Sequence, residues 1–213
     1  MRIDRNVKQI AGCLVAGLLV AGTALVQAAD KPNAAVPLSK LNSEVYLLRE
    51  NLSRTMTALE QLKGAAANNG DLAKPYQAFS SAYEELEKQL ASAREHGTAA
   101  RARAKEHYEA WQKELTEMQN PNLREKAQKR FTAASGEFQK IIDKVATAKE
   151  TFAPLAADLK DINTYLKSDL SNDAVSSLSN TIWRMGHKAK SVDGKLADVN
   201  EQIEKTMKKL PQT

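Results

Sequence analysis

Cysteine is almost absent from this chain of 213 residues, whose single copy, Cys13, falls in an apolar stretch near the start. The rest of the chain can therefore form no disulfide, no thiolate metal site and no cysteine nucleophile. Aromatic side chains are scarce as well, at 5% of the residues. A core built mainly from Leu, Ala, Val and Ile suits long packed helices better than a globule with deep ligand pockets.

Motifs for catalysis and cofactor binding are also missing. The sequence contains no haem attachment motif, no glycine-rich phosphate loop and no Gly-x-Ser-x-Gly elbow. None of the histidines, His96, His107 and His187, follows a glutamate by three residues, which is the spacing of di-iron helical bundles. We interpret His96 and His107, which would share a helix face, as solvated or partly covered side chains beside the seam; a metal pair is the alternative. No enzyme activity, metal or cofactor is expected.

A long apolar run occurs only at the beginning. It extends from Ile10 to Val26 behind a basic start and ends in small residues, so residues 1–28 are interpreted as an export signal that is cleaved after Ala28. An uncleaved membrane anchor is one alternative. Lipidation of Cys13 is another, although the apolar run follows that cysteine instead of preceding it. We expect an exported protein of the periplasm.

Charge of one sign is not concentrated in any part of the chain. The sequence has 31 Lys and Arg against 26 Asp and Glu, interspersed as on solvated helix faces. This mixing and the export signal argue against nucleic-acid binding, while weak contact with anionic envelope surfaces stays open. Charged residues recur every few positions after the signal, which argues against a membrane-inserting, toxin-like bundle.

What the sequence has in abundance is an apolar seam with steps of three and four residues. The average spacing of 3.5 residues predicts long helices that pack against each other as in coiled coils. The first segment carries Leu41, Val45, Leu48, Leu52, Thr55, Leu59 and Leu62. Later segments repeat the rule from Leu72 to Met118, from Leu123 to Leu166 and from Val175 to Leu210.

Helix-breaking residues mark where these helices begin and end. Residues 29–38 include two prolines and are expected to form a flexible tether, after which Ser39 can cap a first helix that ends before Gly64. Asp71 and Asn120 can cap the second and third helices. Ser171, Asn172 and Asp173 supply the turn and the cap that precede the fourth helix.

The predicted fold is all-α, an elongated antiparallel four-helix coiled-coil bundle over residues 39–210 with long second and third helices and a tail at 211–213. Short connections make neighbouring helices antiparallel. A stretch of small residues in the second helix, which includes Gly97 and Ala100, is expected to allow close approach to Val145 and Ala148; a compliant waist is the alternative. Trp183 lies next to the seam, where packing in the core is the common fate of an aromatic residue.

The unequal helix lengths predict a two-helix tip. Folding the first helix back on the second places Leu41 opposite Gly97, and folding the fourth back on the third places Leu210 near Ala133. Neither reaches the turn at Asn120, so residues 109–132 should project as a pair of helices. The apolar side chains expected there, which we predict to contact a partner, are Trp111, Leu115, Met118, Leu123 and Phe131.

A pattern of residues runs without gaps from Trp111 to Leu178. It comprises Trp111, Glu114, Leu115, Asn120, Leu123, Arg124, Phe138, Ile142, Pro154, Leu166, Lys167, Leu170, Ala174, Ser177 and Leu178. The pattern resembles that of the bacterial domain-of-unknown-function 2959 family, except that Ser168 and Asp169 stand where His and Asn are typical. The resemblance implies an exported or envelope-associated helical protein, often a lipoprotein, and implies no catalytic residue.

These observations favour a non-enzymatic exported helical protein that acts as a structural or protein-interaction element of the bacterial envelope. A protein partner or self-association is expected. The alternative is a periplasmic holdase-like chaperone that binds unfolded clients between its helices.

Overall fold

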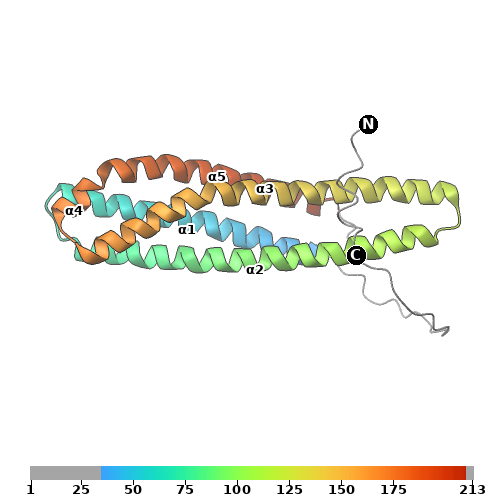
Figure 1. Ribbon diagram of the computed structural model, residues 1–213, viewed down its shortest axis with the longest axis horizontal. Helices are drawn as coiled ribbons and strands as arrows, with labels where there is room; N and C mark the ends of the chain where they lie inside the picture. Colours follow the sequence, from blue (N-terminus) through green and yellow to red (C-terminus); the bar gives the residue numbers. More distant parts are fainter. Residues whose placement is uncertain (1–34, 210–213) are drawn as a thin grey trace. The chain divides into compact units, whose positions relative to one another are not determined.

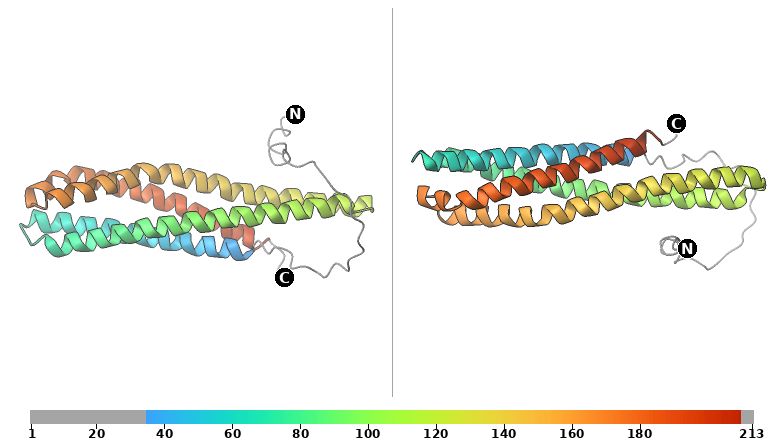
Figure 2. Two further views of the ribbon diagram at one scale, coloured as in Figure 1. Left: turned by 60° about the horizontal axis from the view of Figure 1, so that its bottom comes forward. Right: turned by 90° about the horizontal axis from the view of Figure 1, so that it is seen from above.

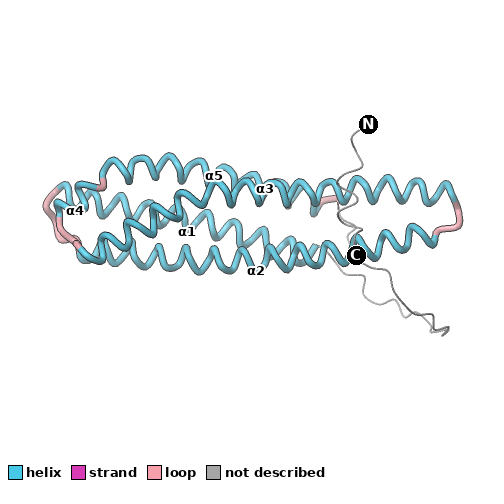
Figure 3. Tube along the Cα trace, viewed as in Figure 1, coloured by secondary structure: helices cyan, strands magenta, loops and turns pink. Residues whose placement is uncertain are grey.

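The computed structural model describes residues 35–209, which belong to one compact unit and whose regular secondary structure is entirely helical (Figures 1 and 3). Its helices are α1 (Ala35–Ala67), α2 (Ala73–Glu117), α3 (Pro121–Ser168), α4 (Asn172–Ser177) and α5 (Ser179–Met207). The predicted all-α fold is thereby confirmed for this part of the chain. The predicted signal at 1–28, with Cys13, and the tail at 211–213 lie outside the described residues. Within residues 35–209, no helix is long and apolar enough to cross a membrane.

The beginning of α1 corrects one prediction. The helix starts at Ala35, four residues before the expected cap at Ser39, so the predicted tether is too long. Pro37 is compatible with this because a proline in the first helical turn sacrifices no intrahelical hydrogen bond. The earlier start buries Leu38 in the core, which adds one more turn to the apolar seam.

The end of α1 also makes the helix longer than predicted. Gly64 lies inside the helix, which continues to Ala67. The chain then reverses at Asn69, whose φ of 49° lies in the left-handed region. The amides of Asn69 and Gly70 donate to the carbonyls of Ala66 and Ala65, at 3.0 and 2.9 Å, which is the hydrogen-bond pattern of a Schellman motif.

Side-chain caps begin α3 and α4 as the sequence predicts. The N-cap of α2 is instead Leu72, which forms no side-chain cap, and the expected cap Asp71 lies one position earlier, where it accepts from the Ala73 amide at 3.0 Å. The Asn120 side chain accepts hydrogen bonds from the amides of Asn122 and Leu123, and Pro121 occupies the first turn of α3. Ser171 accepts from the amide of Ala174 at the start of α4. These contacts satisfy amides that have no partner within their own helix.

The predicted fourth helix is divided in two at Leu178. Its amide donates to the carbonyl of Val175, three residues back, instead of following the four-residue α-helical pattern. The hydroxyl of Ser177 donates to the Ala174 carbonyl, which an unbroken helix would offer to Leu178. Serine side chains compete with the backbone in this way, so a serine-rich stretch separates α4 from α5.

The long helices lie side by side in pairs (Figures 1 and 2). Along α1 and α2, the Thr55 hydroxyl donates to the Ala82 carbonyl at 3.0 Å. Along α1 and α5, Arg49 pairs with Asp193 at 2.7 Å. Along α3 and α5, Lys188 pairs with Asp158 at 2.6 Å. Because α5 contacts both α1 and α3, its apolar face closes a single core among them.

The predicted seam forms this core along α1, whereas two of its positions in α3 are exposed. Every seam position of the first segment is buried, from Leu41 to Leu62. Val145 is 38% exposed although it was expected to face the second helix, and Leu123 is exposed as well. Ile141 and Ala148, which are one heptad apart on either side of Val145, are both buried in the core. Val145 therefore lies at the edge of the core. Trp183 is also not in the core: it is 63% exposed, and its ring contacts that of His187.

Candidate interaction site

Two contacts show how far α1 and α5 extend along their longer neighbours. A Cβ placed on Gly97 of α2 would lie 3.7 Å from the Leu41 side chain, as the predicted register requires. At the end of α5, the Lys209 amine lies 2.9 Å from the carboxylate of Glu137, one turn from the predicted position at Ala133. Helix α1 begins six residues before Leu41, at Ala35. Past that start and past the end of α5, only α2 and α3 continue, joined by residues 118–120 (Figure 1).

This division defines two regions. We call residues 104–117 of α2 and 121–134 of α3 the arm, and the other described residues of α1 to α5 the body. The continuous core cluster of the body reaches Ala100 on α2 and Ile141 on α3. The arm therefore holds itself together through contacts between two helices.

Aromatic rings join the two helices at the base of the arm. Trp111 of α2 meets Phe131 of α3 at 5.6 Å between ring centroids, nearly perpendicular. Tyr108 meets Phe131 and Phe138 at 5.9 and 6.0 Å. His107 packs edge-on against Tyr108 and Trp111 on the same helix. Edge-to-face pairs of this kind stabilise an interface beyond their buried area, so they compensate in part for the missing helices.

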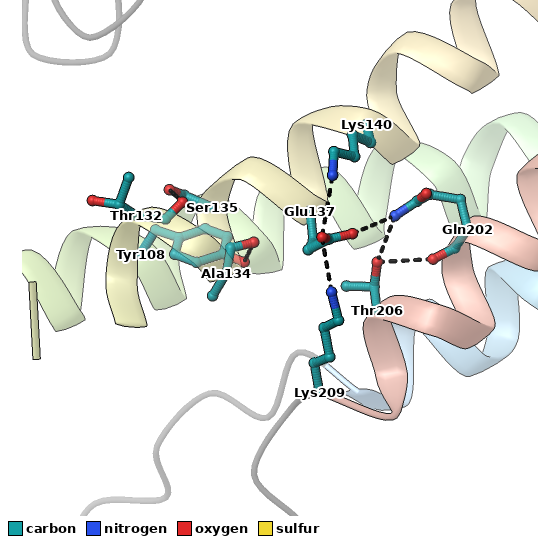
Figure 4. Close-up of polar contacts among 9 residues, drawn as sticks. All are labelled: Tyr108, Thr132, Ala134, Ser135, Glu137, Lys140, Gln202, Thr206 and Lys209. Atoms are coloured by element: carbon teal, nitrogen blue, oxygen red, sulfur yellow. Dashed lines mark hydrogen bonds and ion pairs between the residues drawn. The ribbon is translucent and has the colours of Figure 1, made fainter. Parts of the chain in front are cut away.

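Tyr108 anchors the two helices of the arm with a polar contact as well. Its hydroxyl donates to the Ala134 carbonyl on α3 at 2.9 Å (Figure 4). Burial raises the pKa of Tyr108 to about 12, because removal from water disfavours the phenolate. The hydroxyl thus stays a hydrogen-bond donor throughout the neutral range.

The five predicted partner-contacting residues all lie in the arm or its turn, but in different surroundings. Trp111 and Phe131 contact each other and are half-buried, as is Met118. Leu115 is only 3% exposed, so little of its side chain is open to a partner. Its seam position turns it toward the other helix of the pair. Leu123, by contrast, is 58% exposed.

A shallow, mainly apolar hollow surrounds the turn end of the arm. It is lined by Met118, Gln119, Asn120, Leu123, Lys126, Ala127 and Arg130. The apolar part comes from Met118, Leu123 and Ala127, and two cationic side chains border it. Such a surface can hold an apolar side chain beside an anionic group.

The junction of body and arm carries a cluster of polar contacts around Glu137 (Figure 4). Its carboxylate accepts hydrogen bonds from Lys209, Gln202 and Lys140 at 2.9, 2.8 and 3.2 Å. These donors lower the pKa of Glu137 to about 2, with Lys209 as the largest influence. Gln202 is buried and also donates to Thr206, one turn further along α5. The cluster therefore fastens the last turn of α5 to α3.

The histidines have no common site. His96 lies beside Ser92 and Glu44, His107 in the aromatic cluster and His187 against Trp183. Among residues 35–209, no group of three or more His, Cys, Asp and Glu side chains could hold a metal ion.

Three contributors to this region were not predicted from the sequence. Lys126 and Arg130 border the hollow, and Glu137 receives the end of α5. A signal was available in the spacing, because Leu123, Arg130 and Glu137 follow one another at intervals of seven residues. Seven residues bring a helix back to the same face.

The family model described as Protein of unknown function (DUF2959) matches residues 38–210. No curated protein and no solved structure matches the chain.

Proposed function

The chain belongs to the DUF2959 family of proteins of unknown function, and we propose that it is a non-enzymatic interaction protein that contacts a partner through its arm. The observation that carries this proposal is the exposed Leu123 beside an apolar hollow, at the one end of the described helices that α1 and α5 do not cover. Exposed apolar surface of this kind often marks an interaction site.

The arrangement of the body supports this role. We infer that its long helices form an antiparallel four-helix coiled coil. The contacts between α3 and α5 pair increasing α3 numbers with decreasing α5 numbers, from Glu137 with Gln202 to Asp158 with Lys188, as antiparallel neighbours do. A bundle of this type holds two projecting helices in a defined direction, because α2 and α3 are continuous from body to arm.

The expected place of action is the bacterial envelope. This part of the proposal depends on residues 1–28, whose basic start, apolar run and small-residue end are typical of an export signal. An exported helical protein without a catalytic motif fits a structural or adaptor role better than an enzymatic one.

Photo-crosslinking in cells tests the proposal. A photoreactive amino acid replaces Leu123 in the full chain, and matched chains carry it at Leu47 or Trp183, which are exposed apolar positions of the body. We expect a defined protein to be captured from position 123 and not from the two body positions. Capture of many different proteins along the body would instead indicate a holdase, and equal capture at all positions would contradict a dedicated arm.

A further inference from the structure

The face of α3 that receives α5 has a regular repeat. Asp158 pairs with Lys188 at 2.6 Å, Lys144 with Asp198 at 3.9 Å, and Glu137 with Lys209 at 2.9 Å. The three α3 positions are separated by fourteen and seven residues. They therefore share one flank of the helix, and along it each charge of α3 meets an opposite charge from α5 or the residues just after it.

The same flank continues into the arm without α5. Arg130 lies seven residues before Glu137, and Leu123 lies seven residues before Arg130. Helix α5 ends at Met207, and its final turn is fastened at Glu137. The hollow formed by Leu123, Lys126, Ala127 and Arg130 is thus an extension of the α5-binding face of α3.

The charges of this extension define what would fit on it. In the body, α3 presents both signs along the flank, whereas at the hollow the charged groups are Lys126 and Arg130. Both are exposed, as is Leu123 between the turn and these two cations. A helix that continued the path of α5 would need an apolar stripe for Leu123 and Ala127, and carboxylates beside the cations.

We propose that this face binds an amphipathic helix of another protein, with acidic residues along the edge of its apolar stripe, as an end-to-end continuation of α5. The inference rests on the proposed function and specifies the chemistry of the partner. Cation and carboxylate pairs set the register, while the apolar stripe provides the buried contact.

Segments of the chain itself fit this role poorly. Residues 210–213 contain no acidic residue, and residues 1–34 contain two, Asp4 and Asp30, against four basic residues. A second copy that used the same face would bring Lys126 and Arg130 close to their own counterparts. Like charges across a helix pair are unfavourable, so an acidic helix is the better occupant.

Binding of synthetic peptides to the full chain tests the proposal. Two labelled helical peptides of roughly four heptads share one apolar stripe and carry either Glu or Lys along its edges. We expect fluorescence anisotropy to show binding of the Glu peptide at least about tenfold tighter than that of the Lys peptide, with the difference shrinking as salt is added.

A charge reversal identifies the face. The double substitution Lys126→Glu and Arg130→Glu should invert the preference between the peptides, and Leu123→Ser should weaken both. All three residues are exposed, so folding should persist, as circular dichroism would show. Lys149→Glu reverses an exposed charge on the body part of α3 and should leave the preference unchanged.

Three results would overturn the inference. One is equal binding of both peptides, or a preference that the reversal does not alter. Another is a dimer in sedimentation experiments that the reversal dissociates, which would assign the face to a second copy. The third is binding to anionic vesicles, lost on reversal, without any peptide preference. Capture from position 123 in cells would uphold the proposed function even then, and its absence would remove that function whatever the peptides do.

Discussion

The two parts of α3 offer an internal comparison, because one helix runs through both regions of the molecule. From Ile141 to Leu166 a side chain is buried at nearly every seam position, whereas residues 121–140 contain no fully buried side chain. The three- and four-residue spacing is the same in both parts. The difference lies in the neighbours. Helix α5 covers residues 141–166 and ends beside Glu137, so it leaves the rest of residues 121–140 uncovered. A seam thus identifies a face that can be covered, and the number of helices beside it determines whether it is.

Matched leucine substitutions in the two parts of α3 should differ most in their effect on stability. Leu159 is 0% exposed in the body, and Leu159→Ala should lower the free energy of unfolding by about 2–5 kcal/mol through lost burial and a cavity. Leu123→Ala in the arm removes the same atoms from an exposed site and should change it by less than about 0.5 kcal/mol. Denaturant unfolding of both variants measures the difference.

Similar losses from the two substitutions would mean that Leu123 is covered in solution. The exposed end of the arm would then have a structural occupant, and its role in transient partner binding would have to be abandoned.

A smaller effect is expected at the junction, where Glu137 fastens α5. Its pKa is about 2 in the folded protein, below the ordinary value of 4.5, so its contribution to stability is complete above about pH 4.5 and is lost as the pH falls toward 2. Glu137→Gln should therefore lower the thermal midpoint at neutral pH, and the gap to the unsubstituted protein should narrow between pH 4.5 and 2.

Lys149→Glu serves as the control for that titration, because it changes an exposed charge of α3 away from the junction. If the gap between Glu137→Gln and the unsubstituted protein were constant over the acidic range, the contacts with Lys209 and Gln202 would not stabilise the charged carboxylate.

Much of the fold could be predicted because local rules dominate in long helices. Every predicted seam position of α1 is buried, and the caps at Asn120 and Ser171 followed from residue type. The errors arose where local signals compete. Gly64 weakens a helix without ending it when neighbouring turns are well packed, and the serines around Leu178 interrupt a helix whose seam continues.

The candidate site was less accessible from sequence. Helix lengths alone predicted that α2 and α3 continue as a pair beyond the other helices, since lengths and turns set how far each helix reaches. They could not distinguish Leu115, which faces the neighbouring helix, from Leu123, which faces outward, because both occupy seam positions. The roles of Arg130 and Glu137 depend on the register of α3 against α5, which becomes visible only when both helices are in place.

Hydrogen exchange rates of the α3 amides in the full chain test directly whether one helix has a packed part and a part that no further helix covers. Amides of residues 141–166 should be protected to near the global stability, and those of residues 121–134 should exchange substantially faster through local opening. Uniform protection from residue 121 to residue 166 would contradict the account, because it would show that the arm is as completely covered as the body.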